Sequence, residues 1–317
     1  MSDMTPLGGT ELLASWLHDA LPELTDQVQI ILSRPEEVEL EDKPRILWLH
    51  DLPQDPASQC LRDPSYRTKF NRLVFVSHWQ QHQYNLFLGI PYSQGVVIKN
   101  AVPYRDTTLP KPRENGKLRF AYTSTPHRGL AVVAAAADAL VQERQDWELH
   151  VYSSLNLYGW TERDKVFEPL YEKLRENPCV VYHGTQSNAT VREALDKTHV
   201  HLYPSLYAET SCLAIQEALM AGCLCITSNY GALPETCGEW AWMFQYDERP
   251  EVMAHRTLLN MKQALDNYDH EHVQNALKVQ SVYYQQFYSF QQRVEPWRGL
   301  LKSVILEGAP VEKLIIG

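Results

Sequence analysis

Short runs of β-branched and aromatic residues alternate with helical stretches along the chain, and this alternation occurs twice. The first series is "QVQIIL" (centred on 28–32), "RILWLH" (45–50), "LVFVS" (73–77) and "GVVIKNAV" (95–102). The second series is "LRFAYTS" (118–124), "WELHVYSS" (147–154), "CVVYHG" (179–184), "HVHLYPS" (199–205) and "LCITSN" (224–229). Strands separated by helices are typical of βαβ units, which form parallel sheets. The sequence therefore predicts an α/β fold with two similar units.

The length and the position of one polar linker predict two domains. The chain has 317 residues, whereas one domain usually has roughly 100 to 200. The linker "NAVPYRDTTLPKPRENG" separates a first domain, 1–112, from a second, 113–285, and we expect a C-terminal helix, 286–317, to return to the first domain. Only "MSDMTPL" precedes the turn and helix of "GGTELLASWLHDAL". The first strand is therefore missing or very short, or the sequence begins inside the domain.

Charge and composition exclude several classes of protein. The net charge of −10 argues against a surface built to bind nucleic acid, although an average does not exclude a local basic patch. The most basic stretch, "LPKPRENGKLR", is typical of a polar linker. No transmembrane run or signal peptide is evident, which indicates a cytoplasmic protein. The six cysteines lack zinc-site spacing, so we expect reduced core residues and no structural metal.

The stretch "YAETSCLAIQEALMAG" (207–222) predicts an anion site. It reads as a loop followed by a helix that Thr210 or Ser211 caps and that ends at Gly222. The N–H groups of Ser211, Cys212 and Leu213 would then point out of the helix N-terminus at the carboxyl edge of a parallel sheet. Free donors and the helix dipole bind a diphosphate at such a position.

Two glutamates flank this helix N-terminus. Glu209 precedes it, and Glu217 lies about five residues inside the helix, or roughly 8 Å along its axis. Carboxylates accept paired hydrogen bonds from vicinal hydroxyls, so a sugar could bind at Glu209 and a ribose at Glu217. The alternative is that Glu209 only complements the helix dipole and that Glu217 is an exposed or ion-paired residue.

With its continuation "MAGCLCITSNYGALPET", this stretch resembles the E-x7-E signature of the family-four retaining glycosyltransferases. "GGTE" (8–11), "LVFVSHWQ", "VVIKNAV" and "YTSTPHRGL" extend the resemblance over most of the chain. It implies the GT-B fold, with two Rossmann-like domains facing a cleft; in this chain the first domain is small and, from the residues at its start, lacks a clear first strand. The first domain would bind the acceptor, and the second would bind a nucleotide-sugar donor.

The resemblance also implies roles for individual residues. Glu209 would hold the donor sugar, Arg128 would stabilise the leaving diphosphate, and His50 at a strand end would act near the sugar or acceptor. Family members often pair an Arg with a Lys, whereas here Arg128 has only His127 beside it. His78 is a second candidate for the role of His50. The implied donor-binding residues are Gly8, Gly9, Thr123, Ser124, Arg128, Thr210, Ser211, Cys212, Leu213 and Glu217.

Each of these assignments has a structural alternative. Arg128 could face solvent from a capping turn, His50 could be a structural strand-end residue, and Gly8 and Gly9 could form a simple turn. "GALPET" (231–236) is expected to close over the donor through Gly231, or else it is an ordinary turn.

The resulting expectation is a hexosyl- or pentosyltransferase that retains anomeric configuration. No Asp-x-Asp pattern is evident, so we expect no metal and no cofactor beyond the substrate, a UDP- or GDP-sugar. The acceptor could be a glycan, a small molecule or a nucleic acid. Three other hypotheses stay open: a nucleotide-sugar epimerase, an enzyme that glycosylates a nucleic-acid base, and a non-catalytic nucleotide-sugar-binding protein. The sequence specifies neither the sugar nor the oligomeric state.

Overall fold

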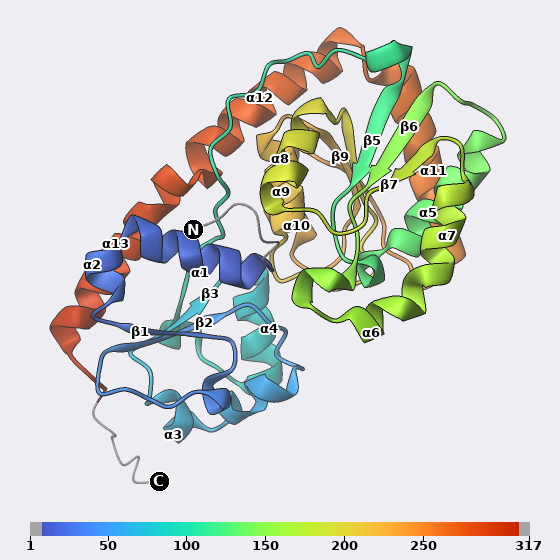
Figure 1. Ribbon diagram of the computed structural model, residues 1–317. Coiled ribbons are helices and arrows are strands. Elements are labelled where there is room, and N and C mark those ends of the chain that lie inside the picture. Colours follow the sequence, from blue (N-terminus) through green and yellow to red (C-terminus); the bar gives the residue numbers. More distant parts are fainter. Residues whose placement is uncertain (1–7, 311–317) are drawn as a thin grey trace. The chain divides into compact units, whose positions relative to one another are not determined.

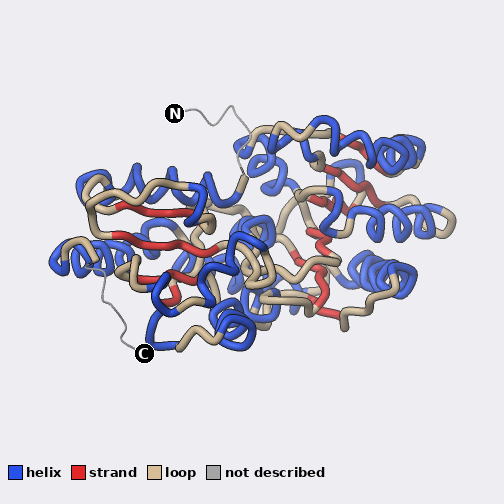
Figure 2. Tube along the Cα trace, turned by 90° about the horizontal axis from the view of Figure 1, so that it is seen from below, coloured by secondary structure: helices blue, strands red, loops and turns tan. Residues whose placement is uncertain are grey.

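The computed structural model of the protein describes residues 8–310. The chain divides into two compact units. Among the described residues, the small unit comprises 9–101 and 288–310, and the large unit comprises residue 8 and 102–287. The sequence-based boundaries lie at 112 and 285. Each unit contains one all-parallel sheet with helices packed against it (Figures 1 and 2), which confirms the predicted α/β fold with two parallel sheets.

The small unit contains a four-stranded sheet in the order β1-β2-β3-β4. Its central strand β2 is buried along its whole length, and Phe75, Tyr84 and Leu88 belong to the core beside it. The first described element is α1, and the prediction of a missing or very short first strand concerns residues before it that lie outside the described part of the chain. The elements are α1 (Gly9–Ala20), α2 (Pro22–Thr25), β1 (Gln29–Leu32), β2 (Arg45–Leu49), α3 (Pro64–Arg67), β3 (Arg72–Phe75), α4 (His78–Leu88), β4 (Gly95–Val97) and α13 (Phe290–Glu307).

The large unit contains a six-stranded sheet in the order β10-β9-β8-β5-β6-β7. Helices α5, α7 and α11 cover one face, and α8, α9 and α10 lie on the other (Figure 1). The elements are β5 (Leu118–Tyr122), α5 (Leu130–Val141), β6 (Trp147–Val151), α6 (Thr161–Asp164), α7 (Glu168–Glu176), β7 (Val180–Tyr182), α8 (Asn188–Lys197), β8 (Val200–Tyr203), α9 (Leu213–Met220), β9 (Leu224–Ser228), α10 (Leu233–Cys237), β10 (Trp242–Phe244), α11 (Pro250–Asn267) and α12 (Glu271–Tyr288).

The strand order of the large unit reverses between β5 and β8. From β5 the chain adds β6 and β7 on one side, and it then returns to add β8, β9 and β10 on the other. In open parallel sheets, ligands bind outside the carboxyl ends of the strands at such a switch point. The loops that follow β5 and β8 are therefore the first place to look for a site.

The stretch that resembled a polar linker is anchored in the large unit. Lys111 is only 5% exposed, and its ammonium donates hydrogen bonds to the carbonyls of Leu195 at 2.8 Å and Thr198 at 2.7 Å. A buried ammonium needs such acceptors. Lys111 thus ties the linker to the C-terminal end of α8, although its composition indicated only a polar linker.

Candidate active site

The loops after β5 and β8 bring Arg128 and Glu209 together at the switch point. A guanidinium N–H of Arg128 (Nη1) donates to Oε1 of Glu209 in an ion pair. The same oxygen accepts a hydrogen bond of 2.8 Å from the hydroxyl of Tyr203, the last residue of β8. The Glu209 side chain is 10% exposed and that of Arg128 is 23% exposed. This is a mostly buried pair whose remaining carboxylate oxygen, Oε2, takes part in neither contact.

Aromatic rings hold the pair in place. The guanidinium carbon of Arg128 lies 3.8 Å from the centroid of the Tyr207 ring, a cation–π contact. Burial opposes the charge of Arg128, but Glu209 and the two tyrosines raise its pKa above the ordinary value, so the residue stays protonated. Burial likewise raises the pKa of Tyr203 well above 10, so its hydroxyl remains a donor.

Gly231 allows the loop of Glu209 to pack closely on the next loop. Its φ of +63° is left-handed, and a Cβ added there would lie 2.5 Å from the backbone nitrogen of Glu209 and 2.7 Å from its carbonyl oxygen. The neighbouring N–H of Ala232 donates to that carbonyl at 2.7 Å. The "GALPET" segment therefore supports Glu209 through backbone contacts that only glycine permits.

Helix α9 begins later than the sequence indicated. Its N-cap is Cys212, whose side chain makes no capping hydrogen bond, so the predicted capping by Thr210 or Ser211 is wrong. Both residues lie in the preceding turn, because the backbone becomes helical only at Leu213. The helix also ends at Met220 rather than Gly222. The first N–H groups of a helix have no partner within it, so those near Cys212 and Leu213 remain suited to an anion.

Glu217 is buried in α9 beside a cation. Its side chain is 12% exposed, and Oε1 lies 3.6 Å from Nη1 of Arg192 on α8. Burial raises the pKa of Glu217 from 4.5 to about 7, although Arg192 and then Arg105 act in the opposite direction. Among the described residues Oε1 has no hydrogen-bond partner. Glu217 is ion-paired, as the alternative interpretation held, but it is not exposed.

The raised pKa predicts a pH-dependent stability that Glu217→Gln removes. Because the folded-state pKa lies above that of the unfolded chain, the contribution of this group is fully present below pH 4.5 and is lost as pH rises through about 7. The loss is on the order of 3 kcal/mol. We expect urea denaturation to show that the stability of the variant relative to wild type increases between pH 5 and 8. A difference that does not change with pH would contradict this account.

The two histidines that contact Arg128 and Thr123 are neutral. The Thr123 hydroxyl, just after β5, lies 2.9 Å from Nε2 of His201, whose pKa burial lowers to about 3. Burial, together with the charge of Arg128, lowers the pKa of His127 to about 4, and its Nε2 accepts a hydrogen bond from Arg128. His127 is therefore not a second cation at neutral pH. Ser124 is half-buried in the same turn.

The remaining predicted residues lie at the start of the chain and in the small unit. Gly8 precedes α1, and Gly9 is its first residue. His50 directly follows β2, and burial of its ring lowers its pKa to about 3, which leaves the imidazole neutral. His78 is exposed at the start of α4. The roles given to these four residues stay predictions.

Sequence reasoning missed three residues of the site. Tyr203 and Tyr207 belong to the loop "YPSLYAE" (203–209), where their spacing next to an acid was an available signal. No sequence signal pointed to Arg192, because an arginine in a polar helix such as α8 is expected to face solvent. In the structure Arg192 is only 7% exposed.

Two general properties hold for the part of the chain that the structure describes. It contains no group of three or more histidine, cysteine or acidic side chains that could hold a metal ion. The described helices also include none that is both long and apolar enough to cross a membrane.

Comparisons with known proteins agree with this geometry. Residues 119–261, from β5 into α11, match the family model described as glycosyl transferases group 1. A glycosyltransferase of Rickettsia africae has a similar structure, with a TM-score of 0.71 and 11% identity over 94% of this chain and 82% of that one. The chain has the GT-B fold. The predicted resemblance to a GT-B glycosyltransferase is thereby confirmed.

Other GT-B structures extend the comparison. HepE of Anabaena in complex with UDP and glucose has a TM-score of 0.65 and 15% identity, with 82% of this chain and 72% of that chain covered. Sucrose-phosphate synthase of Thermosynechococcus elongatus has a TM-score of 0.65 and 13% identity, with 94% and 79% covered. No curated protein sequence matches the chain. At these identities the structures show a shared fold, and the family match supports glycosyltransferase activity.

Proposed function

We propose that the protein transfers a glycosyl group from a nucleotide sugar to an acceptor hydroxyl with retention of anomeric configuration. One observation carries the proposal: the buried pair of Arg128 and Glu209 lies at the switch point of a GT-B donor-type domain, next to the N-terminus of α9. A cation, a carboxylate and free helix N–H groups are what a glycosyl diphosphate requires.

The same geometry supports a division of roles. Arg128 and the N–H groups of Ser211, Cys212 and Leu213 would bind the diphosphate. Oε2 of Glu209, which neither Arg128 nor Tyr203 contacts, would accept hydrogen bonds from the donor sugar. Oε1 of Glu217 is buried without a hydrogen-bond partner among the described residues, and ribose hydroxyls would supply one. Thr123 and Ser124 would contact a phosphate from the turn after β5.

The reaction that fits these groups is attack on the same face that the leaving group departs from. The acceptor oxygen forms a bond to the anomeric carbon as the bond from that carbon to the phosphate oxygen breaks. The acceptor proton passes to the departing diphosphate, whose charge Arg128 and the helix N–H groups stabilise. In this proposal no metal takes part. The neutral imidazole of His50 would accept a hydrogen bond from an acceptor or sugar hydroxyl.

The nucleotide can be identified by a stability screen. We expect UDP, GDP, ADP or dTDP, or one of their sugars, to raise the melting temperature by about 5 °C at a hundredfold excess over its Kd. UDP-glucose is the first compound to test, because the similar HepE structure holds UDP and glucose. Glu217→Ala should abolish the shift.

Two results would count against the proposal. No shift with any nucleotide would favour a non-catalytic protein. A shift that persists in Glu217→Ala would remove Glu217 from the donor site. A control variant is Glu193→Ala, because Glu193 lies on the neighbouring helix α8 and has no ion pair with Arg192 among the described contacts.

A further inference from the structure

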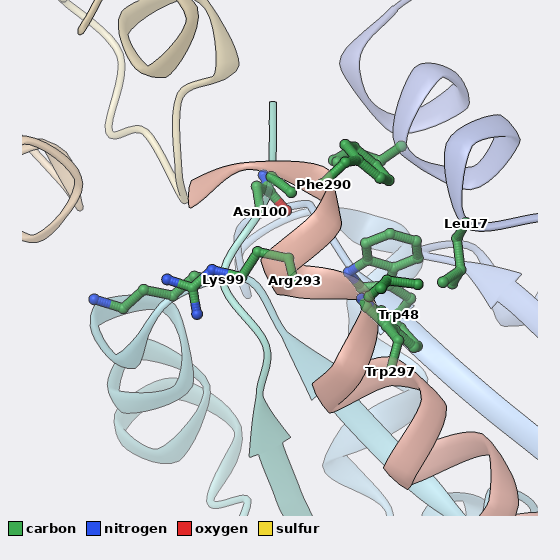
Figure 3. A pocket seen from close by; sticks show the side chains of 10 residues that line it. Leu17, Trp48, Lys99, Asn100, Phe290, Arg293 and Trp297 are labelled. Carbon is green, nitrogen blue, oxygen red and sulfur yellow. The ribbon is translucent and has the colours of Figure 1, made fainter. Parts of the chain in front are cut away.

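A small cavity lies inside the small unit, which supplies all of its lining residues. It is bordered by α1, by β2, by the segment after β4 and by α13 (Figure 3). Its volume is about 10 Å³, which is room for roughly one water-sized group. The lining residues that matter here are Trp48, Lys99, Asn100, Phe290, Arg293 and Trp297.

Two buried polar atoms of this lining lack a hydrogen bond. Nε1 of Trp48 and Oδ1 of Asn100 have no partner among the described residues, and their side chains belong to residues that are 2% and 6% exposed. Native proteins rarely leave such atoms unsatisfied, so each one indicates a missing partner. The indole N–H can only donate and the amide oxygen can only accept. A hydroxyl group does both, and it fits the volume.

The rest of the lining combines positive charge with aromatic surface. Lys99 and Arg293 extend to the same side, away from the indoles of Trp48 and Trp297 (Figure 3). None of the described lining residues is acidic. The two indole rings lie 4.5 Å apart between centroids, and with Phe290 they offer apolar surface to the C–H groups of a small ligand.

We propose that this cavity and its mouth bind a hydroxylated phosphate monoester, such as a polyol phosphate or a sugar phosphate. One hydroxyl enters the cavity between Trp48 Nε1 and Asn100 Oδ1, and the phosphate binds to Lys99 and Arg293. The further step, that this ligand is the glycosyl acceptor, rests on the proposed function. An acceptor in this cavity would lie near His50, the residue proposed to contact an acceptor or sugar hydroxyl, because its ring centroid lies 4.8 Å from that of Trp48.

Calorimetric titration of the full chain without any donor tests the binding. The probes are glycerol 3-phosphate and glucose 6-phosphate, with glycerol, glucose and inorganic phosphate for comparison. We expect at least one ester to bind about tenfold or more tightly than both its neutral counterpart and inorganic phosphate, because only the ester satisfies the cavity and the cations together.

Three variants assign the binding to this cavity. Trp48→Phe removes the N–H donor but keeps an aromatic ring, Asn100→Leu removes the acceptor at similar volume, and Arg293→Gln removes one charge. Each should weaken binding of the ester about tenfold. The control is Arg298→Gln, because Arg298 lies further along α13, pairs with Glu295 and does not line the cavity. It should leave the affinity unchanged. A melting curve for each variant confirms that it folds.

Several results would overturn the inference. These are no binding of either ester at about 10 mM, equal affinity for inorganic phosphate, or unchanged affinity in both Trp48→Phe and Asn100→Leu, which would mean that water alone fills the cavity. A different result would contradict the proposed function alone. If the ester binds but no nucleotide does, the transferase proposal is wrong and the proposed ester site is supported. Ester binding should also survive Glu217→Ala, which removes only the proposed donor binding.

Discussion

Replacing Arg128 by glutamine should lower kcat about 100- to 1000-fold with the donor that the nucleotide screen selects. The reason is that the leaving diphosphate gains charge in the transition state, and a preorganised donor at that position contributes about 3 to 4 kcal/mol to its stabilisation. His127 beside it is neutral at pH 7 and does not replace the lost charge. The measurement is steady-state turnover at saturating donor, for which release of the nucleotide diphosphate gives a direct readout.

Two controls separate chemistry from folding. The first control is Arg144→Gln, because Arg144 is also paired with carboxylates, those of Asp146 and Asp266, but lies outside the switch-point loops. This variant should keep kcat within about twofold of the wild-type value. Arg128→Gln leaves Glu209 buried without its cation, which itself destabilises the fold. The double variant Arg128→Gln/Glu209→Gln should regain stability but not activity. Normal turnover in Arg128→Gln would instead show that the arginine only terminates a turn.

Gly231→Ala should unfold or displace the Glu209 loop, with a loss of several kcal/mol in stability and about 100-fold or more in activity. A left-handed alanine alone costs about 1 kcal/mol. Here the new Cβ would also meet the backbone of Glu209 at 2.5 Å, and backbone atoms cannot rotate away as a side chain would. Urea denaturation and turnover measure the two effects.

A second glycine, Gly89, shows how much of the loss in stability comes from the left-handed backbone conformation alone. Gly89 has a φ of +68°, close to that of Gly231, and a Cβ there would meet nothing within 4 Å. Gly89→Ala should therefore cost only about 1 kcal/mol and leave activity unchanged. Equal effects of the two substitutions would mean that the contact with Glu209 does not matter.

The fold was predictable because its signal is local and repeated. Strands β1 to β9 all coincide with the runs that were identified, since strands are rich in β-branched and aromatic residues. The strand β10 was not predicted. It has only three residues, Trp242–Phe244, of which the first two are half-buried. At the edge of the sheet, so short a strand gives no recognisable sequence pattern.

The site was predictable only in part, because its contacts join distant segments. The sequence indicated that Arg128 and Glu209 matter, but nothing in it indicated that they pair with each other or that Arg192 reaches Glu217. The start of α9 was placed too early, because serine and threonine are usual caps and a cysteine is not. The orphaned atoms of Trp48 and Asn100 become visible only when burial and hydrogen bonds are known.

The pairing of Arg128 with Glu209 has a consequence for the end of the catalytic cycle. The arginine already has an anionic partner in Glu209, so in the proposed reaction a diphosphate would share that positive charge with Glu209 instead of receiving all of it. If Arg128 binds the diphosphate as proposed, the Glu209 carboxylate would compete with the nucleotide diphosphate for this cation after transfer. We expect this internal competition to weaken product inhibition and to shorten the time that the nucleotide diphosphate remains bound.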